Sequence, residues 1–91
     1  MASDVKKRHT REVKDMIAMK SLKVARTERL WRQEDLAKAA KLGIFTIFRA
    51  EQGETIEMLT AQKILRALNL RGKELGLSEL TLKEIDLTIK E

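Results

Sequence analysis

Two short helical patterns stand only three residues apart in the middle of the chain, and this spacing limits the fold more than any other feature. In residues 33–40 and again in residues 44–52, apolar or small side chains recur at the interval of one helical face. Gly43 suits the start of the second pattern. Gly53 suits its end, because glycine adopts a left-handed conformation without steric cost. We therefore expect two short helices that are joined by a tight turn and cross each other.

Residues within the two patterns suit such a crossing. Ala37 is small enough for a close approach, and Leu36, Leu42 and Ile47 are placed to fix the angle between the helices. A pair of this kind is a helix-turn-helix, whose second helix protrudes far enough to enter the major groove of DNA. The sequence therefore indicates a DNA-binding module in the middle of the chain.

The charge of the chain is uneven along its length. Residues 1–53 carry 13 Lys and Arg against 7 Asp and Glu, whereas residues 54–91 carry 6 against 7, which together give the net charge of +5. A positive N-terminal half indicates a polyanion as its partner. Charge alone leaves a merely soluble basic surface open as the alternative.

Composition argues against enzymes, metal sites and membrane segments. The chain of 91 residues suits one domain with a small core, has no cysteine and has one histidine, His9, so no cofactor or metal is expected. The acidic pairs have no nucleophile beside them, and no glycine-rich phosphate loop is present. No apolar run approaches the roughly 18–20 residues that span a bilayer. We expect a cytoplasmic, non-enzymatic protein.

The N-terminal segment divides into an arm and a helical pattern. Residues 1–10 include the basic run Lys6–His9 and are expected to form a flexible arm, which either follows the DNA or stays in solvent. From Thr10 to Ala25 apolar residues fall on one helical face, which predicts a helix.

The C-terminal part begins with a helix and ends with an alternating pattern. An amphipathic helix is predicted from Met58 to Leu68, with its end at Asn69 or Gly72. In residues 84–89 apolar side chains alternate with polar ones, which predicts a half-buried strand that pairs with a symmetry mate. A last helix also fits this segment.

Between Leu22 and Leu70 the chain resembles the Xre/Cro family of phage-repressor-like domains. The resemblance rests on a set of residues in register: Arg26, Gln33, Leu36–Ala37, Thr46–Ile47, Glu51, Gly53 and Ile64–Leu70. It implies an all-α, five-helix domain over residues 11–72, two-fold symmetric dimers, and operator binding that usually represses transcription. Residues 73–91 are then a dimerisation or partner-binding extension.

One part of the motif is similar to a narrower branch of this family. The run Arg49–Glu54 together with Ile64–Leu68 resembles the HipB-like antitoxins. Members of that branch repress their own operon, hold a kinase-type protein toxin, and pair a C-terminal strand across the dimer.

The resemblance implies roles for individual residues. Base contacts are expected from the recognition helix, residues 44–52, at Ile44, Phe45, Phe48 and Arg49, and Arg49 has the fork that bonds guanine O6 and N7 together. Backbone contacts are expected from Arg32, Gln33, Lys38, Lys41 and Thr46. Two further residues have structural roles: Glu51 forms an ion pair with Arg26, and Trp31 fills the core between the first two helices.

The chain departs from the family pattern at three places. Lys41 replaces the usual turn glycine, which costs about 1 kcal/mol if the backbone there is left-handed. Arg32 stands where a Ser or Thr would cap the helix. The recognition surface is apolar at Ile44, Phe45 and Phe48, which leaves three interpretations: contacts with thymine methyl groups, a protein-docking face, or one phenylalanine turned into the core.

Two functions are therefore carried forward. The first is a homodimeric, sequence-specific repressor that binds double-stranded DNA. The second is an antitoxin or adaptor that binds a toxin or another protein, with DNA binding retained for autoregulation or lost.

Overall fold

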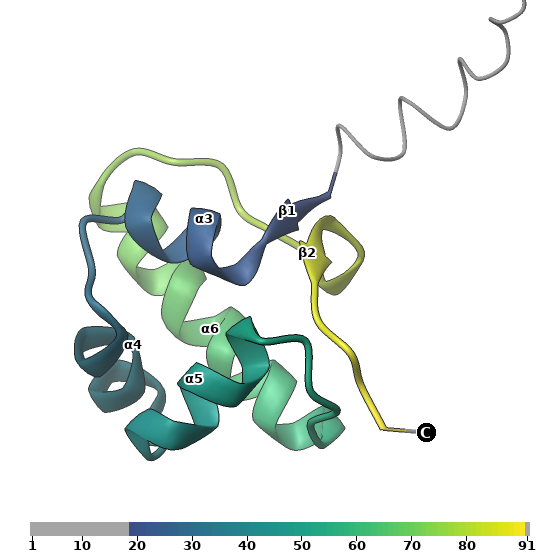
Figure 1. The fold of residues 1–91 in the computed structure, drawn as a ribbon. Coiled ribbons are helices and arrows are strands. Elements are labelled where there is room, and N and C mark those ends of the chain that lie inside the picture. Colours follow the sequence, from purple (N-terminus) through teal and green to yellow (C-terminus); the bar gives the residue numbers. More distant parts are fainter. Residues whose placement is uncertain (1–18, 91) are drawn as a thin grey trace, which may run out of the picture.

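The computed structural model describes residues 19–90, which form a body of helices with a short C-terminal extension along one side (Figure 1). Its four α-helices are α3 (Leu22–Glu28), α4 (Gln33–Ala40), α5 (Ile44–Glu51) and α6 (Met58–Glu74). Two-residue strands, β1 (Lys20–Ser21) and β2 (Ile85–Asp86), and the 3-10 turn η1 (Leu82–Glu84) complete it. The two helices of the predicted motif are confirmed. Within this part of the chain, no helix is long and apolar enough to cross a membrane.

The helix predicted from Thr10 to Ala25 does not include Lys20–Ser21, where the chain is extended. Ser21 accepts a hydrogen bond on Oγ from Val24 N at 3.1 Å, and with this N-cap α3 begins at Leu22. Residues 10–18, the remainder of that predicted helix, and the expected basic arm lie outside the described residues. The described part therefore holds four of the five expected helices.

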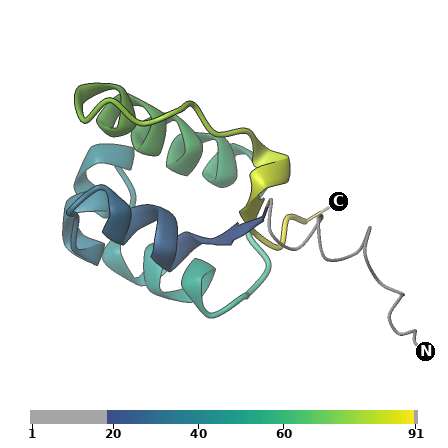
Figure 2. The same ribbon diagram turned by 90° about the horizontal axis from the view of Figure 1, so that it is seen from above.

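The three shorter helices lie together on one side of α6, and the core lies between them and α6 (Figure 2). Fully buried apolar side chains come from every helix and from β2: Leu22, Leu36, Ile47, Ile64, Leu68 and Ile85. Burying a side chain of this size contributes about 1.5–3 kcal/mol. The single buried position contributed by β2 shows that the C-terminal extension is part of the core.

A buried arginine fastens the end of α3 to α6. Arg29 is 1% exposed, and its guanidinium donates to Ala25 O and to Leu68 O, both at 2.8 Å. Burial lowers the pKa of the Arg29 guanidinium, and the nearby carboxylate of Glu28 opposes that shift. The role of Arg29 could not be predicted from the sequence, because a buried arginine has no local signature there.

Trp31 follows directly in the connection to α4. It is half-buried and packs against the core, as expected, and an arginine of α6 lies over its ring. The guanidinium carbon of Arg71 lies 5.6 Å from the centroid of the Trp31 ring, and Arg71 Nε donates to Arg29 O at 3.0 Å. The tryptophan is thus held in the body of the domain.

The predicted end of α6 at Asn69 or Gly72 is wrong, because the helix continues past both residues. Each of them makes a tertiary contact from inside the helix. A Cβ atom at Gly72 would lie 3.1 Å from the Arg29 guanidinium, so this glycine makes room inside the helix. The Asn69 side chain accepts from Leu80 N at 2.8 Å and donates to Leu80 O at 2.9 Å. The helix ends at Glu74, and Gly76 takes the left-handed conformation with φ 76°.

Residues 80–90 form what we call the C-terminal strap, and it pairs with two distant parts of the same chain. β2 lies parallel to β1, with Ile85 opposite Lys20. Farther along, Ile56 N donates to Thr88 O at 2.8 Å and Lys90 N donates to Ile56 O at 2.7 Å. The alternation predicted over residues 84–89 is present as these two short pairings. Their partner strands come from the same chain, whereas we expected a symmetry mate.

The turn between α4 and α5 is left-handed at Lys41, with φ 59° and ψ 45°. This is the conformation for which the family uses glycine, and Lys41 N closes the turn by donating to Lys38 O at 3.1 Å. At the start of α4, where Arg32 offers no acceptor, the Asp35 carboxylate accepts from Arg32 N at 2.7 Å. As expected, the Arg32 side chain makes no cap hydrogen bond to the first turn of α4. Asp35 satisfies only the N–H of Arg32 itself, which is half of a capping box.

Replacing Lys41 with glycine should stabilise the domain by about 1 kcal/mol, because it relieves the left-handed backbone of a Cβ atom. Urea unfolding followed by circular dichroism measures this. Lys41→Ala is the matched control: it also removes the charge but keeps the Cβ atom, so its stability should stay near that of the parent chain. Equal stabilities for the two variants would contradict the explanation.

Candidate nucleic-acid interface

Two inward-facing side chains set how α5 lies on the body. Ile47 and Ala50 are 0% and 2% exposed and pack in the same core as Leu36 and Ala37 of α4. Residues three or four apart share a helical face, so burying these two positions turns the opposite side of α5 outward. Leu42, in the turn, packs against the same core, as the sequence predicts.

A buried ion pair joins α5 to α3. Arg26 Nε lies 2.6 Å from Glu51 Oε2, and the two side chains are only 9% and 6% exposed. Arg26 also donates through Nη1 to Trp31 O at 3.0 Å, and Gln33 Nε2 donates to Glu51 Oε1 at 3.1 Å. The predicted pairing of Arg26 with Glu51 is confirmed. The network ties α3, α4 and α5 together at the C-terminal end of α5.

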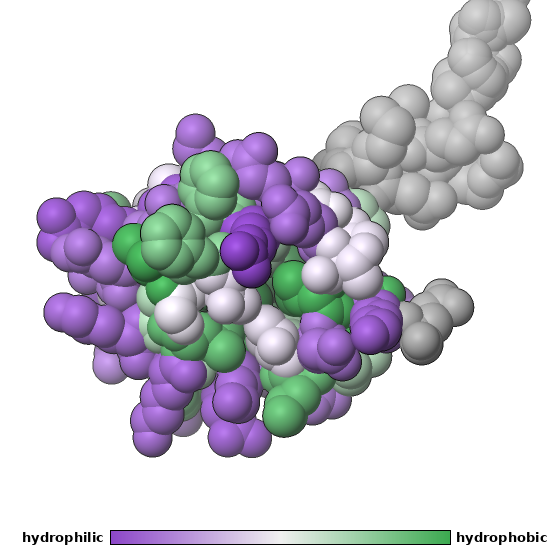
Figure 3. All heavy atoms as spheres, turned by 60° about the horizontal axis from the view of Figure 1, so that its bottom comes forward, coloured by the Kyte–Doolittle hydropathy of each residue, from purple (hydrophilic) through white to green (hydrophobic). Residues whose placement is uncertain are grey.

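The outward side of α5 is largely apolar. Ile44, Phe45 and Phe48 are 42%, 71% and 48% exposed. The space-filling view that brings the lower side of Figure 1 forward shows hydrophobic surface lying among hydrophilic side chains (Figure 3). The interpretation that one phenylalanine turns into the core is therefore wrong. The other two interpretations of the apolar face, thymine contacts and protein docking, remain open.

Three of the expected cationic contacts are exposed and unpaired. Lys38 on α4, Lys41 in the turn and Arg49 on α5 form no ion pair with any residue of the 19–90 range. Positive side chains without carboxylate partners are available to phosphates or base edges. Arg49 belongs to the helix that carries the apolar face, and Lys38 and Lys41 come from the helix and the turn just before it.

Two further expected backbone contacts, Arg32 and Gln33, are already engaged with carboxylates. Arg32 Nη2 lies 3.0 Å from Glu34 Oε2, and its Nε lies 3.7 Å from Asp35 Oδ2. Gln33 uses one amide hydrogen on Glu51. Arg32 is nonetheless 78% exposed at its side chain, so its pairing is a surface one with little strength of its own.

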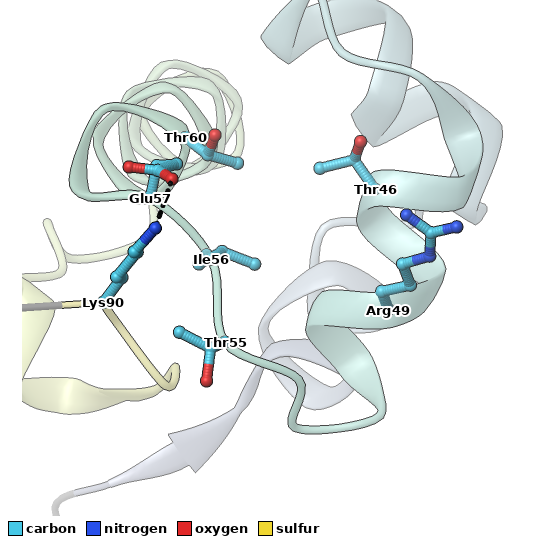
Figure 4. A pocket seen from close by; sticks show the side chains of 7 residues that line it. All are labelled: Thr46, Arg49, Thr55, Ile56, Glu57, Thr60 and Lys90. Carbon is cyan, nitrogen blue, oxygen red and sulfur yellow. Dashed lines mark ion pairs between the residues drawn. The ribbon is translucent and has the colours of Figure 1, made fainter.

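An open cleft of about 440 Å³ lies between α5 and the start of α6, as Figure 4 shows from close by. Thr46 and Arg49 line it from α5, and Thr55, Thr60 and Lys90 are among the residues on its other side. Lys90 Nζ is 3.6 Å from Glu57 Oε2. Sequence reasoning missed Lys90, because only the pairing of the strap with Ile56 brings the end of the chain to this cleft.

Metal ligands do not gather at this surface: residues 19–90 contain no cluster of three or more His, Cys, Asp or Glu side chains that suits a metal ion. His9, the one histidine, lies outside the described residues.

Comparison with known proteins gives one result. A family model described as helix-turn-helix matches residues 22–75, which covers all four helices and the cleft except for the strap. No curated protein and no solved structure matches the chain.

Replacing Glu51 with alanine should destabilise the domain by about 3 kcal/mol or more, because it leaves the Arg26 charge buried without its partner. Chemical unfolding measures this. Glu54→Ala, an exposed glutamate just past the same helix, is the control and should change stability by less than about 0.5 kcal/mol. A loss as small for Glu51→Ala as for the control would mean that the pair does not hold α5.

Proposed function

Because the chain belongs to the Xre/Cro-type helix-turn-helix family, whose members are DNA-binding regulators and generally not enzymes, we propose that it is a sequence-specific transcriptional repressor that acts as a homodimer. One observation carries the proposal. The inner side of α5 is locked to the body by Ile47 and by the Arg26–Glu51 pair, while its outer side is exposed. That is the arrangement in which a short helix enters a major groove.

Within this proposal the exposed residues of α5 meet the base edges, and their neighbours meet the backbone. Arg49 reads guanine through O6 and N7, because its planar fork matches that pair of acceptors. Lys38 and Lys41 neutralise phosphates, and Thr46 donates its hydroxyl to one.

Gln33 and Arg32 keep their proposed backbone roles in spite of their intramolecular bonds. A glutamine amide has two hydrogens, and the bond to Glu51 uses one. A guanidinium has five donors, so the ion pairs of Arg32 leave donors for a phosphate.

The proposal of a homodimer rests on the small number of base pairs that one recognition helix can contact. An eight-residue α5 contacts only a few base pairs, which is too short a sequence to be distinctive in a genome. Two copies related by two-fold symmetry place their recognition helices in half-sites about 34–36 Å apart and double the sequence that is read.

The exposed aromatic side chains favour a second candidate function, an antitoxin or adaptor in which the outer face of α5 holds a protein. Clustered apolar residues at a surface are typical of protein interfaces, and Phe45 is 71% exposed. DNA binding then serves autoregulation, as in the HipB-like branch, or is lost. Copurification of a neighbouring gene product, combined with equal affinity for promoter and random DNA, would favour this function over the first.

Arg49→Ala should relax base preference, whereas Lys41→Ala should lower affinity for every sequence alike. Titration of specific and random duplexes at several salt concentrations separates the two effects. Losing one phosphate contact should also make the slope of log affinity against log salt shallower by about 0.9. If each variant weakened specific and random binding by the same factor, the assignment of Arg49 to the bases would be wrong.

The homodimer is tested by light scattering on the free protein and on its complex with DNA. We expect two chains per operator and a palindromic operator whose half-site centres are about 10–10.5 base pairs apart. One chain bound to a site without two-fold symmetry would exclude the homodimer but leave DNA binding intact.

A further inference from the structure

The side chains on the outer face of α5 limit which bases this helix can recognise. Three of its four base-facing side chains, Ile44, Phe45 and Phe48, have neither a hydrogen-bond donor nor an acceptor, and all three are substantially exposed. The acidic residue of the helix, Glu51, is turned inward and occupied by Arg26 and Gln33. Most of this face therefore has no means of recognising a base by hydrogen bonding.

One feature of the major groove matches such a face. Adenine, guanine and cytosine present only donors and acceptors there, whereas thymine also presents its C5-methyl group. Buried against an apolar side chain, a methyl group contributes favourably, while the polar edges of the other bases would lose water without a partner. An apolar recognition helix thus discriminates in favour of thymine.

The positive charge near this face favours DNA over a protein as its binding partner. Arg49 lies on the same helix, and Lys38 and Lys41 lie on the helix and the turn before it. None of the three forms an ion pair among residues 19–90, and residues 1–53 carry six more positive than negative charges. An apolar strip bordered by unpaired cations fits the floor of a groove that phosphates border on both sides.

We propose that each half-site contains two adjacent thymines whose methyl groups pack against Ile44, Phe45 and Phe48, beside a guanine that Arg49 reads. This inference rests on the proposed function. Side chains three or four residues apart on a helix are separated by about 5–6 Å at Cβ, and stacked base pairs rise by about 3.4 Å. The apolar cluster therefore spans about two neighbouring base pairs.

The test removes the methyl group and nothing else. The full chain first selects its preferred sequence from a library of randomised duplexes. The enriched duplex is then synthesised with thymine and, in a second version, with uracil at the two thymines of each half-site. Uracil keeps the pairing and O4 but lacks the methyl group. We expect affinity to fall about fourfold for each methyl group removed, and so about fifteenfold for each half-site.

Variants assign that loss to α5. In Phe45→Ala and Phe48→Ala the ratio of affinities for the thymine and uracil duplexes should move toward one, because the partner of the methyl group is gone. Lys38→Ala is the control: it should weaken binding to both duplexes equally and leave the ratio unchanged. Both phenylalanines are exposed, so the fold should persist, and the thymine–uracil comparison on the parent chain does not depend on any variant.

The outcomes separate this inference from the function on which it rests. An enriched sequence that binds equally well with uracil would overturn thymine reading and leave the repressor intact. A selection that enriches no sequence would overturn sequence-specific binding itself, and the apolar face would then belong to a protein partner.

Discussion

Arg26 and Glu51 hold two charges almost out of water, and their 2.6 Å contact has to offset the cost of removing both from solvent. The surrounding bonds help: Trp31 O accepts from Arg26, and Gln33 donates to Glu51. Two apolar side chains of the same size would stabilise the body equally well, but their contact would not fix the relative orientation of α3 and α5. The ion pair fixes the end of α5 relative to α3, and every contact made by the outer side of that helix depends on this.

Local signals were sufficient for the centre of the fold. The bounds of α4 and α5 follow from two short periodic patterns, the second of which lies between Gly43 and Gly53, and the left-handed Lys41 follows from its place in the turn. The Arg26–Glu51 pair was expected from the family resemblance, because two charges on different helices have no local pattern that joins them. Reasoning of this kind succeeds where neighbours in sequence are also neighbours in space.

Sequence reasoning failed where distant segments meet. Gly72 was interpreted as a helix end, and only its contact with Arg29 explains a glycine inside a continuing helix. The alternation after Glu84 predicted a strand correctly, but periodicity gives no information on its partner. At the candidate site the exposure of Phe45 and Phe48 also needed the structure, since a phenylalanine on a short helix is equally compatible with the core.

The C-terminal strap joins two distant parts of the helical body. It is paired with β1 before the first described helix and with Ile56 in the connection between α5 and α6, so one segment fastens both. Ile56 lines the same cleft as Arg49. A displacement of the strap would therefore move one wall of the cleft beside Arg49, next to the surface proposed to contact DNA.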